Sequence, residues 1–334
     1  MTIEVVDNVA LFEQQRRRLF GIAYRMLGEA AEAEDVVQDA YLRWSGRADA
    51  PEAGQQRTDR SGAPAGGRPG QAERPGQVER PGQVERPGQV ERPAAWLTTV
   101  VTNLCINRLT SARARRERYV GPWLPEPVAT GNDPLAAVEL KDTMSLGFLV
   151  LLEKLTPPER AVFVLREAFA YTHRDTAEVL AVDEAHARQL YHRALARIGA
   201  DRTRFEARPA DSTKLVERFI AATVDGDVEG LEAILTEDAA IWADGGGKAI
   251  AAREPIFGRS NAAHYLAGLA AGPRAQTAHL SIAEVNNAPA ILVHESGTLT
   301  GILVPEFRNS AITTIRAILN PDKLTHTRPH LPDQ

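Results

Sequence analysis

The stretch 46–93 carries almost no large apolar side chain, and it constrains the fold more than any other feature of the chain. Within it, RPGQAE at 68–73 is followed by RPGQVE repeated through 74–91. Proline and glycine in every repeat prevent a regular helix or strand. One valine per repeat buries too little surface to offset the entropy lost on ordering. We therefore expect a disordered insertion between two helices that pack together, because a long loop adds little closure entropy.

Two helices are predicted before the insertion, over 9–27 and 30–44, and Gly28 is expected to end the first. The second helix has an acidic and polar face beside Leu42, which we expect to be exposed. This face is either merely solvated, as most charged helix faces are, or a docking surface for a partner. Its residues are Asp35, Gln38 and Asp39.

A third helix is predicted after the insertion, over 96–118, with an apolar face in its first half and a basic second half. Arginines can hold DNA phosphates, and amides at helical spacing can reach base edges or unstacked bases. The helix therefore suits a nucleic-acid surface; the alternative is a core helix that ends in a solvated charge run. The candidate residues are Trp96, Asn103, Asn107, Arg108, Arg113, Arg115 and Arg116.

Length and composition narrow the class of protein. The 334 residues, 43% of them hydrophobic, suffice for two or three domains. Cys105 is the only cysteine, so an intramolecular disulfide is excluded, and we expect a buried thiol in a reducing compartment. We see no N-terminal signal pattern and no apolar run long enough to span a bilayer, so a cytoplasmic location without membrane contact is predicted. The formal net charge of −5 suggests that any DNA binding is assisted by another protein.

A second helical region is predicted beyond a linker at 119–134. The linker is rich in proline and glycine, yet it contains Trp123 and Leu124, which we expect to dock on another surface. A helix is predicted over 135–154, and Thr156 is expected to cap the next helix through a capping box with Glu159.

The end of this region has the pattern of a helix-turn-helix. A short helix ends at a turn over 181–183, and a longer helix begins at Glu184 with polar and basic residues. Such residues can enter the major groove of DNA; the alternative is a three-helix bundle that does not bind DNA. The candidate reading residues are His186, Arg188, Gln189, His192 and Arg193.

The last third of the chain predicts helices first and then a curved antiparallel sheet, an α+β cone of the SnoaL or NTF2 kind. Helices are expected over 212–224, 228–235 and 261–269, and strands over 239–243, 277–285, 290–295, 299–305 and 311–319. Asn286-Asn287 and Ser296-Gly297 are expected at turns.

This fold forms a pocket, and an acid beside a histidine there could transfer a proton. Pocket histidines are more often structural, however, and no nucleotide-binding or nucleophile-elbow motif is present. The motif DGGGK at 244–248 lacks the spacing of a phosphate loop and favours a tight turn against another surface. We therefore predict no catalytic residue, no cofactor and no metal. The residues that could line the pocket are Trp242, Asp244, His264, Tyr265, His279 and His294.

Residues 8–204 resemble the two conserved domains of bacterial extracytoplasmic-function (ECF) RNA polymerase sigma factors. The segments that carry the resemblance, in family order once the repeat is removed, are DVVQDAYLRW, AWLTTVVTNLCINRLTSARARRERYVG and LTPPERAVFVLREAF with its helix-turn-helix. The short motifs WLPEP at 123–127, DGGGK at 244–248 and NPDK at 320–323 are similar to those of the SigJ-like subgroup, which carries a C-terminal SnoaL-like domain.

The resemblance implies a role for each candidate set. The acidic face around Asp39 would bind core RNA polymerase, the helix beginning near Trp96 would hold the opened −10 element, and the helix beginning at Glu184 would read the −35 element. Two departures stand out. The repeat occupies the place of a short loop that shapes the pocket for a flipped −10 base, and Trp96 is the only aromatic residue of the melting helix, so only well-matched promoters should be melted.

The resulting interpretation is a multidomain sigma factor rather than an enzyme: two all-α sigma domains followed by an α+β SnoaL/NTF2-like cone. The expected boundaries are 1–118 for sigma domain 2 with the insertion at about 46–93, 119–134 for the linker, 135–206 for sigma domain 4, 211–326 for the regulatory domain and 327–334 for a tail. The alternative is a ligand-sensing SnoaL-type enzyme fused to a DNA-binding regulator.

Regulation is expected through contact between the C-terminal domain and the sigma domains, and the motifs leave its sign open. The predicted contact residues are Trp123, Leu124, Pro125, Asp244, Gly245, Gly246, Gly247, Lys248, Asn320, Pro321, Asp322 and Lys323. The expected partners are core RNA polymerase and promoter DNA.

Deleting the repeats at 68–91 should leave the melting temperature of the protein unchanged, because their composition offers nothing to a core. Differential scanning calorimetry of the deletion variant beside the full chain measures this, and a clear drop in melting temperature would show that the repeats pack.

Overall fold

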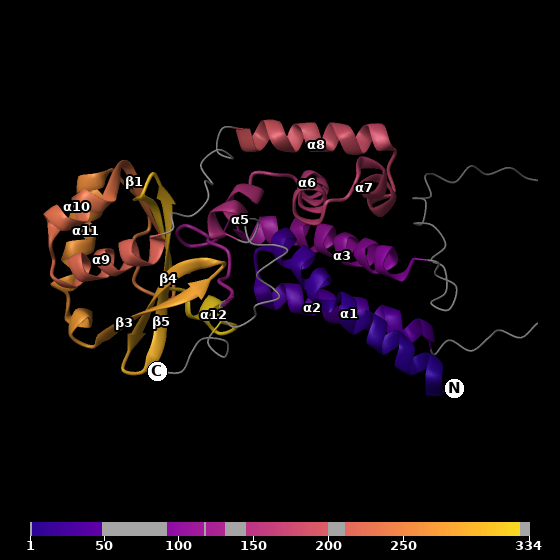
Figure 1. The fold of residues 1–334 in the computed structure, drawn as a ribbon, viewed down its shortest axis with the longest axis horizontal. Helices are drawn as coiled ribbons and strands as arrows, with labels where there is room; N and C mark the ends of the chain where they lie inside the picture. The colour runs from indigo at the N-terminus through magenta and orange to yellow at the C-terminus, as the bar shows by residue number, and fades with distance from the viewer. Residues whose placement is uncertain (1, 49–91, 117, 131–144, 200–210, 328–334) are drawn as a thin grey trace, which may run out of the picture.

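The computed structural model describes residues 2–48, 92–116, 118–130, 145–199 and 211–327. Figure 1 shows a helical half joined side by side to a half built on a sheet. The hexad repeats and the expected beginning of the helix over 135–154 lie outside the described residues. Among the described residues, no helix combines the length and apolarity that crossing a membrane requires.

The first part of the helical half is formed by three packed helices. They are α1 (Thr2–Leu27), α2 (Ala30–Ala48) and α3 (Pro93–Arg116). Gly28 ends α1 with a φ of 71°, as its residue type predicts. Trp44 of α2 is buried against Trp96 of α3, with their ring centroids 5.8 Å apart. Cys105 is fully buried in the same core, which confirms the expected packing role of this residue.

The second part of the helical half contains the helix-turn-helix. Its helices are α5 (Leu146–Leu152), α6 (Pro157–Phe169), α7 (His173–Leu180) and α8 (Glu184–Ile198). Thr156 and Glu159 form the predicted capping box at the start of α6. Ala170 and Ala181 end α6 and α7 in left-handed conformations, which turn the chain sharply between the helices. Helices α6 and α7 pack on α1 and α3, so both parts share one core.

The other half of the molecule is a six-stranded sheet whose longer helices pack on one face and whose last, short helix lies on the other. The helices are α9 (Ser212–Val224), α10 (Val228–Ile234), α11 (Arg259–Ala270), η4 (Pro273–Gln276) and α12 (Pro321–Leu324). The strands are β1 (Leu235–Asp244), β2 (Ile256–Phe257), β3 (Ala278–Val285), β4 (Ala288–Glu295), β5 (Thr298–Arg308) and β6 (Ala311–Ile318). Their order across the sheet is β2-β1-β6-β5-β4-β3. Asn286, Asn287, Ser296 and Gly297 have positive φ at the turns, as predicted.

Two details of the sheet differ from the sequence expectation. The sheet is mixed rather than antiparallel, because β1 pairs in parallel with β6, while β3 to β6 form an antiparallel meander. The chain crosses over from β1 through α11 before it enters the meander, and that connection allows the parallel pairing. Strand β2 and helix α12 were not predicted, because two and four residues are too short to show a periodicity.

Both faces of the sheet are buried. Along β4, Ile291 points into a core made with α9, α10 and α11, whereas its neighbour Leu292 belongs to the core of the helical half. Alternate side chains of a strand point to opposite faces. The helical half therefore covers one face of the sheet, and this places the linker between the two halves.

Candidate nucleic-acid interface and interdomain junction

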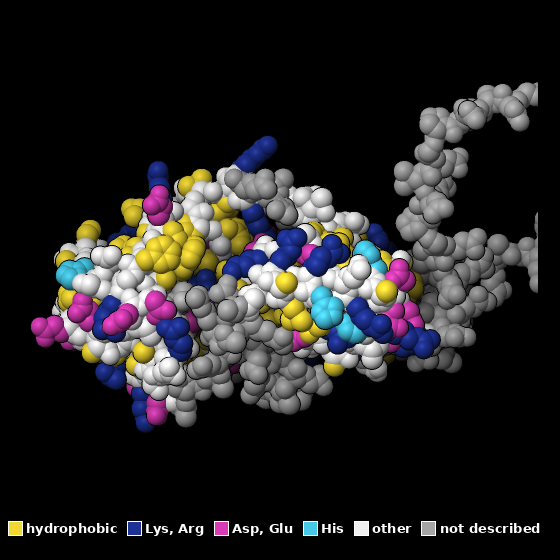
Figure 2. Space-filling model, turned by 90° about the horizontal axis from the view of Figure 1, so that it is seen from above, with side chains coloured by type: hydrophobic (Ala, Val, Ile, Leu, Met, Phe, Trp, Pro, Cys, Tyr) yellow, Lys and Arg dark blue, Asp and Glu magenta, His cyan; other side chains and the backbone are white. Residues whose placement is uncertain are grey.

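Helix α8 presents a polar and basic face to solvent. Asp183 caps it by accepting a hydrogen bond from the N–H of His186 at 2.7 Å. Ala187, Leu190 and Ala194 are buried against the rest of the helix-turn-helix. Figure 2 looks onto this side of the molecule, where arginine and histidine side chains gather over the helical half. The predicted reading residues are all exposed: His186, Arg188, Gln189, His192 and Arg193.

Arg188 is held on the surface of α8 by an ion pair with Glu184, one helical turn earlier. Both side chains are about half exposed, at 55% and 43%, so the pair is weak. A DNA base could therefore replace Glu184 as the partner of Arg188 at small cost.

The predicted polymerase-binding face and the predicted −10 helix are in direct contact. Nη2 of Arg108 on α3 donates to Oδ2 of Asp39 on α2 at 2.8 Å, and Nη1 lies 3.8 Å from Oδ2 of Asp35. Gln38 is exposed beside them, and Asn103 and Asn107 are exposed along α3. Arg108 thus holds the acidic face of α2 against α3.

Arg116 lies in a place that the sequence did not predict. Its side chain is 13% exposed and forms ion pairs with Glu29 at 3.2 Å and with Glu153. Its guanidinium lies 3.6 Å from the ring centroid of Trp123, and it donates to the carbonyl of Leu27 at 2.5 Å. In this arrangement Arg116 joins α3 to the α1–α2 turn, to the end of α5 and to the linker instead of facing solvent. The side chains of Arg113 and Arg115 lie outside the described residues.

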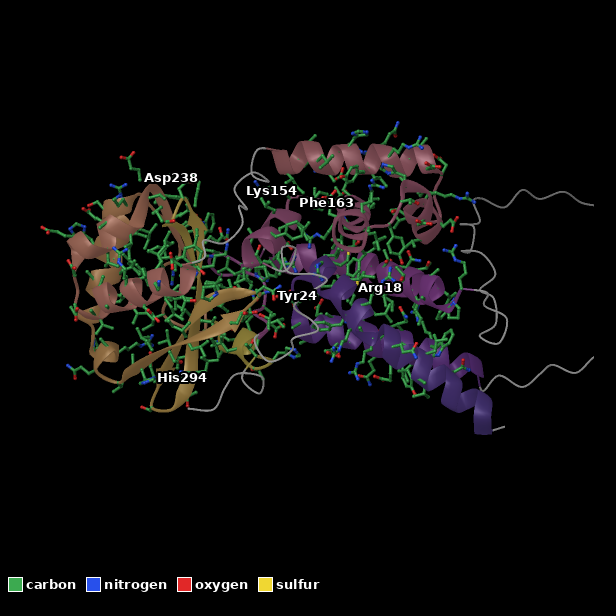
Figure 3. The ribbon with its side chains drawn as sticks, in the orientation of Figure 1. Arg18, Tyr24, Lys154, Phe163, Asp238 and His294 are labelled. Atoms are coloured by element: carbon green, nitrogen blue, oxygen red, sulfur yellow. The ribbon has the colours of Figure 1, made fainter. Side chains whose placement is uncertain are left out.

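The linker joins the two halves through a first group of buried hydrogen bonds. The hydroxyl of Tyr24 on α1 donates to the carbonyl of Glu126 at 2.6 Å and accepts from Nδ2 of Asn286, in the β3–β4 turn, at 2.7 Å. Oδ1 of Asn286 accepts from the N–H of Val128 at 3.0 Å. Figure 3 shows Tyr24 where the helical half meets the sheet. Asn286 therefore connects directly to the helical half as well as to the linker.

The side chain of Glu126 caps helix α2 from the linker. Its Oε2 accepts from the N–H of Ala31 at 3.1 Å, and its backbone N–H donates to the carbonyl of Gly28 at 2.8 Å. Burial raises the pKa of this carboxyl, and the N–H groups of Ala31 and Ala30 oppose the shift. A carboxylate at a helix N-terminus is favoured by the unpaired N–H groups there.

A second group of buried contacts surrounds the fully buried carboxylate of Asp244, and it brings together the three short motifs. Asp244 accepts from the hydroxyl of Tyr119 at 2.6 Å, from the N–H of Leu124 at 2.9 Å and from Nζ of Lys323 at 2.7 Å. Lys323 also donates to the carbonyl of Leu124. Asn320 Nδ2 donates to the Tyr119 hydroxyl at 2.7 Å. We call these residues, Tyr119, Leu124, Asp244, Asn320 and Lys323, the Asp244 cluster.

Aromatic rings complete the surroundings of the Lys323 amine. Nζ lies 4.3 Å from the ring centroid of Trp123 and 4.9 Å from that of Tyr119. The Trp123 ring thus contacts two cations, the amine of Lys323 and the guanidinium of Arg116. Burial lowers the pKa of Lys323, and the Asp244 carboxylate opposes that shift. Burial, followed by the hydrogen bond to Asp244, raises the pKa of Tyr119, which keeps this hydroxyl a donor.

The glycines after Asp244 let the chain approach closely. Gly246 has a φ of 57°, and a Cβ atom there would lie 2.4 Å from Nδ2 of Asn320 and 2.8 Å from the Tyr119 hydroxyl. Any side chain at this position would separate the DGGGK turn from the linker. Lys248 forms an exposed ion pair with Asp322, so it is the member of this motif that stays on the surface.

The residues expected to line a pocket do not converge. Trp242 packs on the helical-half side of the sheet, whereas Tyr265 packs on the opposite core. His264 is exposed on α11, and Asp244 belongs to the interdomain cluster. His294 faces His279 across the β3–β4 pair, far from Tyr24 in Figure 3. No acid–histidine arrangement for proton transfer is formed by these residues.

Comparison with known proteins agrees with this architecture. A family model for Sigma-70 region 2 matches residues 11–57, and one for Sigma-70 region 4 matches residues 146–198. The chain is 35% identical over 266 residues to the ECF RNA polymerase sigma factor SigJ of Mycobacterium tuberculosis, covering 78% of this chain and 73% of that protein. The chain belongs to the extracytoplasmic-function sigma factors. This sigma factor is also 26% identical over 326 residues to the probable ECF RNA polymerase sigma factor SigI of the same organism, covering 96% of each.

The crystal structure of M. tuberculosis SigJ superposes with a TM-score of 0.68 at 30% identity, over 98% of this chain and 100% of that one. The expected fold class, helical sigma domains followed by an α+β C-terminal domain, is thereby confirmed. The family is one of transcription factors, which confirms that this sigma factor is not an enzyme.

Sequence reasoning missed several residues of the junction. Tyr24 and Glu126 lie in segments that were assigned to a helix face and a linker, and Asn286 was assigned only to a turn. A signal was present for Glu126 alone, as an acid between two prolines of the WLPEP motif. Tyr119 follows the basic helix and carries no pattern of its own.

Replacing Lys323 by methionine should destabilise the protein by about 3–5 kcal/mol, because it leaves the buried Asp244 carboxylate without its ion partner. The matched control is Lys248→Ala, whose exposed pair with Asp322 should contribute about 0–1 kcal/mol. Urea denaturation of both variants measures the difference, and equal midpoints would contradict the role given to Lys323.

Proposed function

We propose that this sigma factor binds core RNA polymerase in the cytoplasm, directs it to −10 and −35 promoter elements, and is held in a closed form by its C-terminal domain. Membership of the sigma factor family supports the binding of polymerase and its direction to promoters. The exposed face of α8 supports −35 reading, and the exposed amides of α3 support −10 binding. The Asp244 cluster is the single observation that carries the regulatory part.

The packing of the two sigma regions supports a closed form. Helices α6 and α7 pack on α1 and α3, and the core is continuous between them. Their two promoter elements, by their names, lie about 25 base pairs apart, or roughly 85 Å along a duplex at 3.4 Å per base pair. Helices in mutual contact cannot occupy both elements at once. The sigma regions must therefore separate when they engage a promoter.

The C-terminal domain opposes that separation through the linker. Arg116 is bound at once by Glu29 of the α1–α2 turn, by Glu153 at the end of α5 and by the ring of Trp123. Trp123 and Leu124 are in turn held by Lys323 and Asp244. Opening the sigma regions breaks contacts that the C-terminal domain stabilises. We therefore infer negative regulation, a population shift between a closed and an open form.

Arg188→Ala should reduce transcription from a cognate promoter by roughly ten-fold or more, since a bidentate base contact contributes about 1–3 kcal/mol. Lys214→Ala, which removes a still more exposed charge on α9, is the control and should transcribe like the parent protein. Transcription with purified core enzyme measures both, and an unchanged footprint and start site in Arg188→Ala would show that α8 is not the reader.

The double variant Asp35→Arg with Asp39→Arg should fail to bind core RNA polymerase while it remains folded, because it reverses the charge of the acidic face of α2. Glu13→Arg, on the exposed side of α1, is the control. Co-purification with core enzyme measures binding, and circular dichroism measures folding. Binding of the folded double variant at the parent yield would refute the assignment of this face.

Tyr119→Phe removes only the phenolic hydroxyl, and it tests the proposed negative regulation by the C-terminal domain. Loss of the hydroxyl takes a donor from buried Asp244, at a cost of about 1–3 kcal/mol, and should shift the population toward the open form. The expected result is faster proteolysis of the linker and several-fold more transcription at limiting core enzyme. The control is Tyr265→Phe, in the opposite core, which should change neither.

Faster proteolysis with unchanged or lower transcription would refute negative regulation. If Tyr119→Phe leaves proteolysis unchanged, Lys323→Met disturbs the Asp244 cluster more strongly. Its linker proteolysis and transcription are then compared with those of the parent protein, below the melting temperature of the variant.

A further inference from the structure

A cleft of about 480 Å³ lies between the two sigma regions, and of the residues that line it only Trp96 has been given a promoter role above. One wall comes from α1 and α3 and includes Arg18, Trp96 and Thr99; the other comes from α6, the following turn and α7, and includes Tyr171 and Glu178. The volume falls within the range of roughly 300–1,000 Å³ typical of small-ligand sites.

Arg18 is a cation that lacks an anionic partner among the described residues. Its guanidinium lies 5.9 Å from the ring centroid of Phe169 and 5.3 Å from that of Tyr171. These ring contacts satisfy the face of the guanidinium and leave its N–H donors for another group. Figure 3 shows Arg18 in the helical half, below α6 and α7. An arginine placed in this way suits a phosphate.

The remaining walls suit a planar base. Trp96 is partly buried and rests against Trp44, with ring centroids 5.8 Å apart, so its indole is held in place where it lines the cleft. The Tyr171 ring is fixed by a hydrogen bond from its hydroxyl to Oγ1 of Thr98 at 3.1 Å. Glu178 is half exposed, and its ion pair with Arg92 spans 3.6 Å. A carboxylate of this kind can accept hydrogen bonds from the amino group of a base.

From these contacts we infer that the cleft binds a free nucleotide, with its base on the Trp96 indole and its phosphate on Arg18. A nucleotide in this position touches both sigma regions, so it binds only when they are packed together. Binding would therefore favour the closed form. This consequence rests on the regulation proposed above, whereas nucleotide binding itself does not.

Isothermal titration calorimetry of the full-length protein, without polymerase, tests the inference with ATP, GTP, CTP, UTP and inorganic phosphate. We expect saturable binding of at least one nucleotide at one site per chain, no comparable binding of phosphate, and a higher melting temperature with the nucleotide present. Arg18→Gln should weaken the affinity by at least about ten-fold, because charge-assisted hydrogen bonds to phosphate are strong. Arg17→Gln, next to it but outside the cleft, should bind like the parent protein.

Three outcomes would overturn the inference: no binding of any of the four nucleotides, equal binding by Arg18→Gln and Arg17→Gln, or phosphate binding as tightly as a nucleotide. A single-stranded oligonucleotide that binds where mononucleotides do not would assign the cleft to promoter DNA and would also overturn it. If Arg18→Gln does not fold, Ala95→Leu fills the cleft from α3 and should abolish binding. These binding results stand whatever the transcription assays show.

Discussion

The buried carboxylate of Asp244 is the interaction on which the arrangement of the halves depends. A charge removed from water is very unfavourable unless it is paired and hydrogen-bonded. Here the carboxylate and its partners come from three distant segments: Asp244 itself at the end of β1, Tyr119 and Leu124 of the linker, and Lys323 of α12. Each segment therefore satisfies a polar group that would otherwise be buried without a partner.

Two arginines of α3 are engaged by other parts of the molecule. Arg116 is surrounded by Glu29, Glu153 and Trp123, and Arg108 is paired with Asp39. The ion pairs lie within the sigma regions, whereas Trp123 belongs to the linker and is also contacted by Lys323 of the sheet domain. One aromatic ring, that of Trp123, thus connects the sheet domain to the end of α3.

Both faces of the sheet are covered by other parts of the chain. Ile291 and Leu292 are neighbours in sequence, and they belong to different cores because a strand alternates its side chains. One face serves the C-terminal domain's own fold, and the other is the surface on which the helical half rests. This division explains why the polar residues of the third part of the chain do not gather around one pocket: Asp244 is used at the junction, and His264 remains outside.

The sequence by itself determined the local elements and the family. The capping box at Thr156, the stop at Gly28, the turns at Asn286 and Ser296, and the exposed polar face of α8 follow from hydrogen-bonding and backbone rules that act over a few residues. Only the tertiary structure decided the parallel pairing of β1 with β6, the burial of Arg116 and the meeting of Tyr24 with Asn286. These are contacts between residues far apart in the chain, and their formation depends on which surfaces remain to be buried once the local elements exist. The motifs WLPEP, DGGGK and NPDK show the difference between local and tertiary information. Their residue types predicted tight contacts. The Asp244 cluster that unites them exists only because the fold brings a carboxylate, an amine and a hydroxyl within hydrogen-bonding distance.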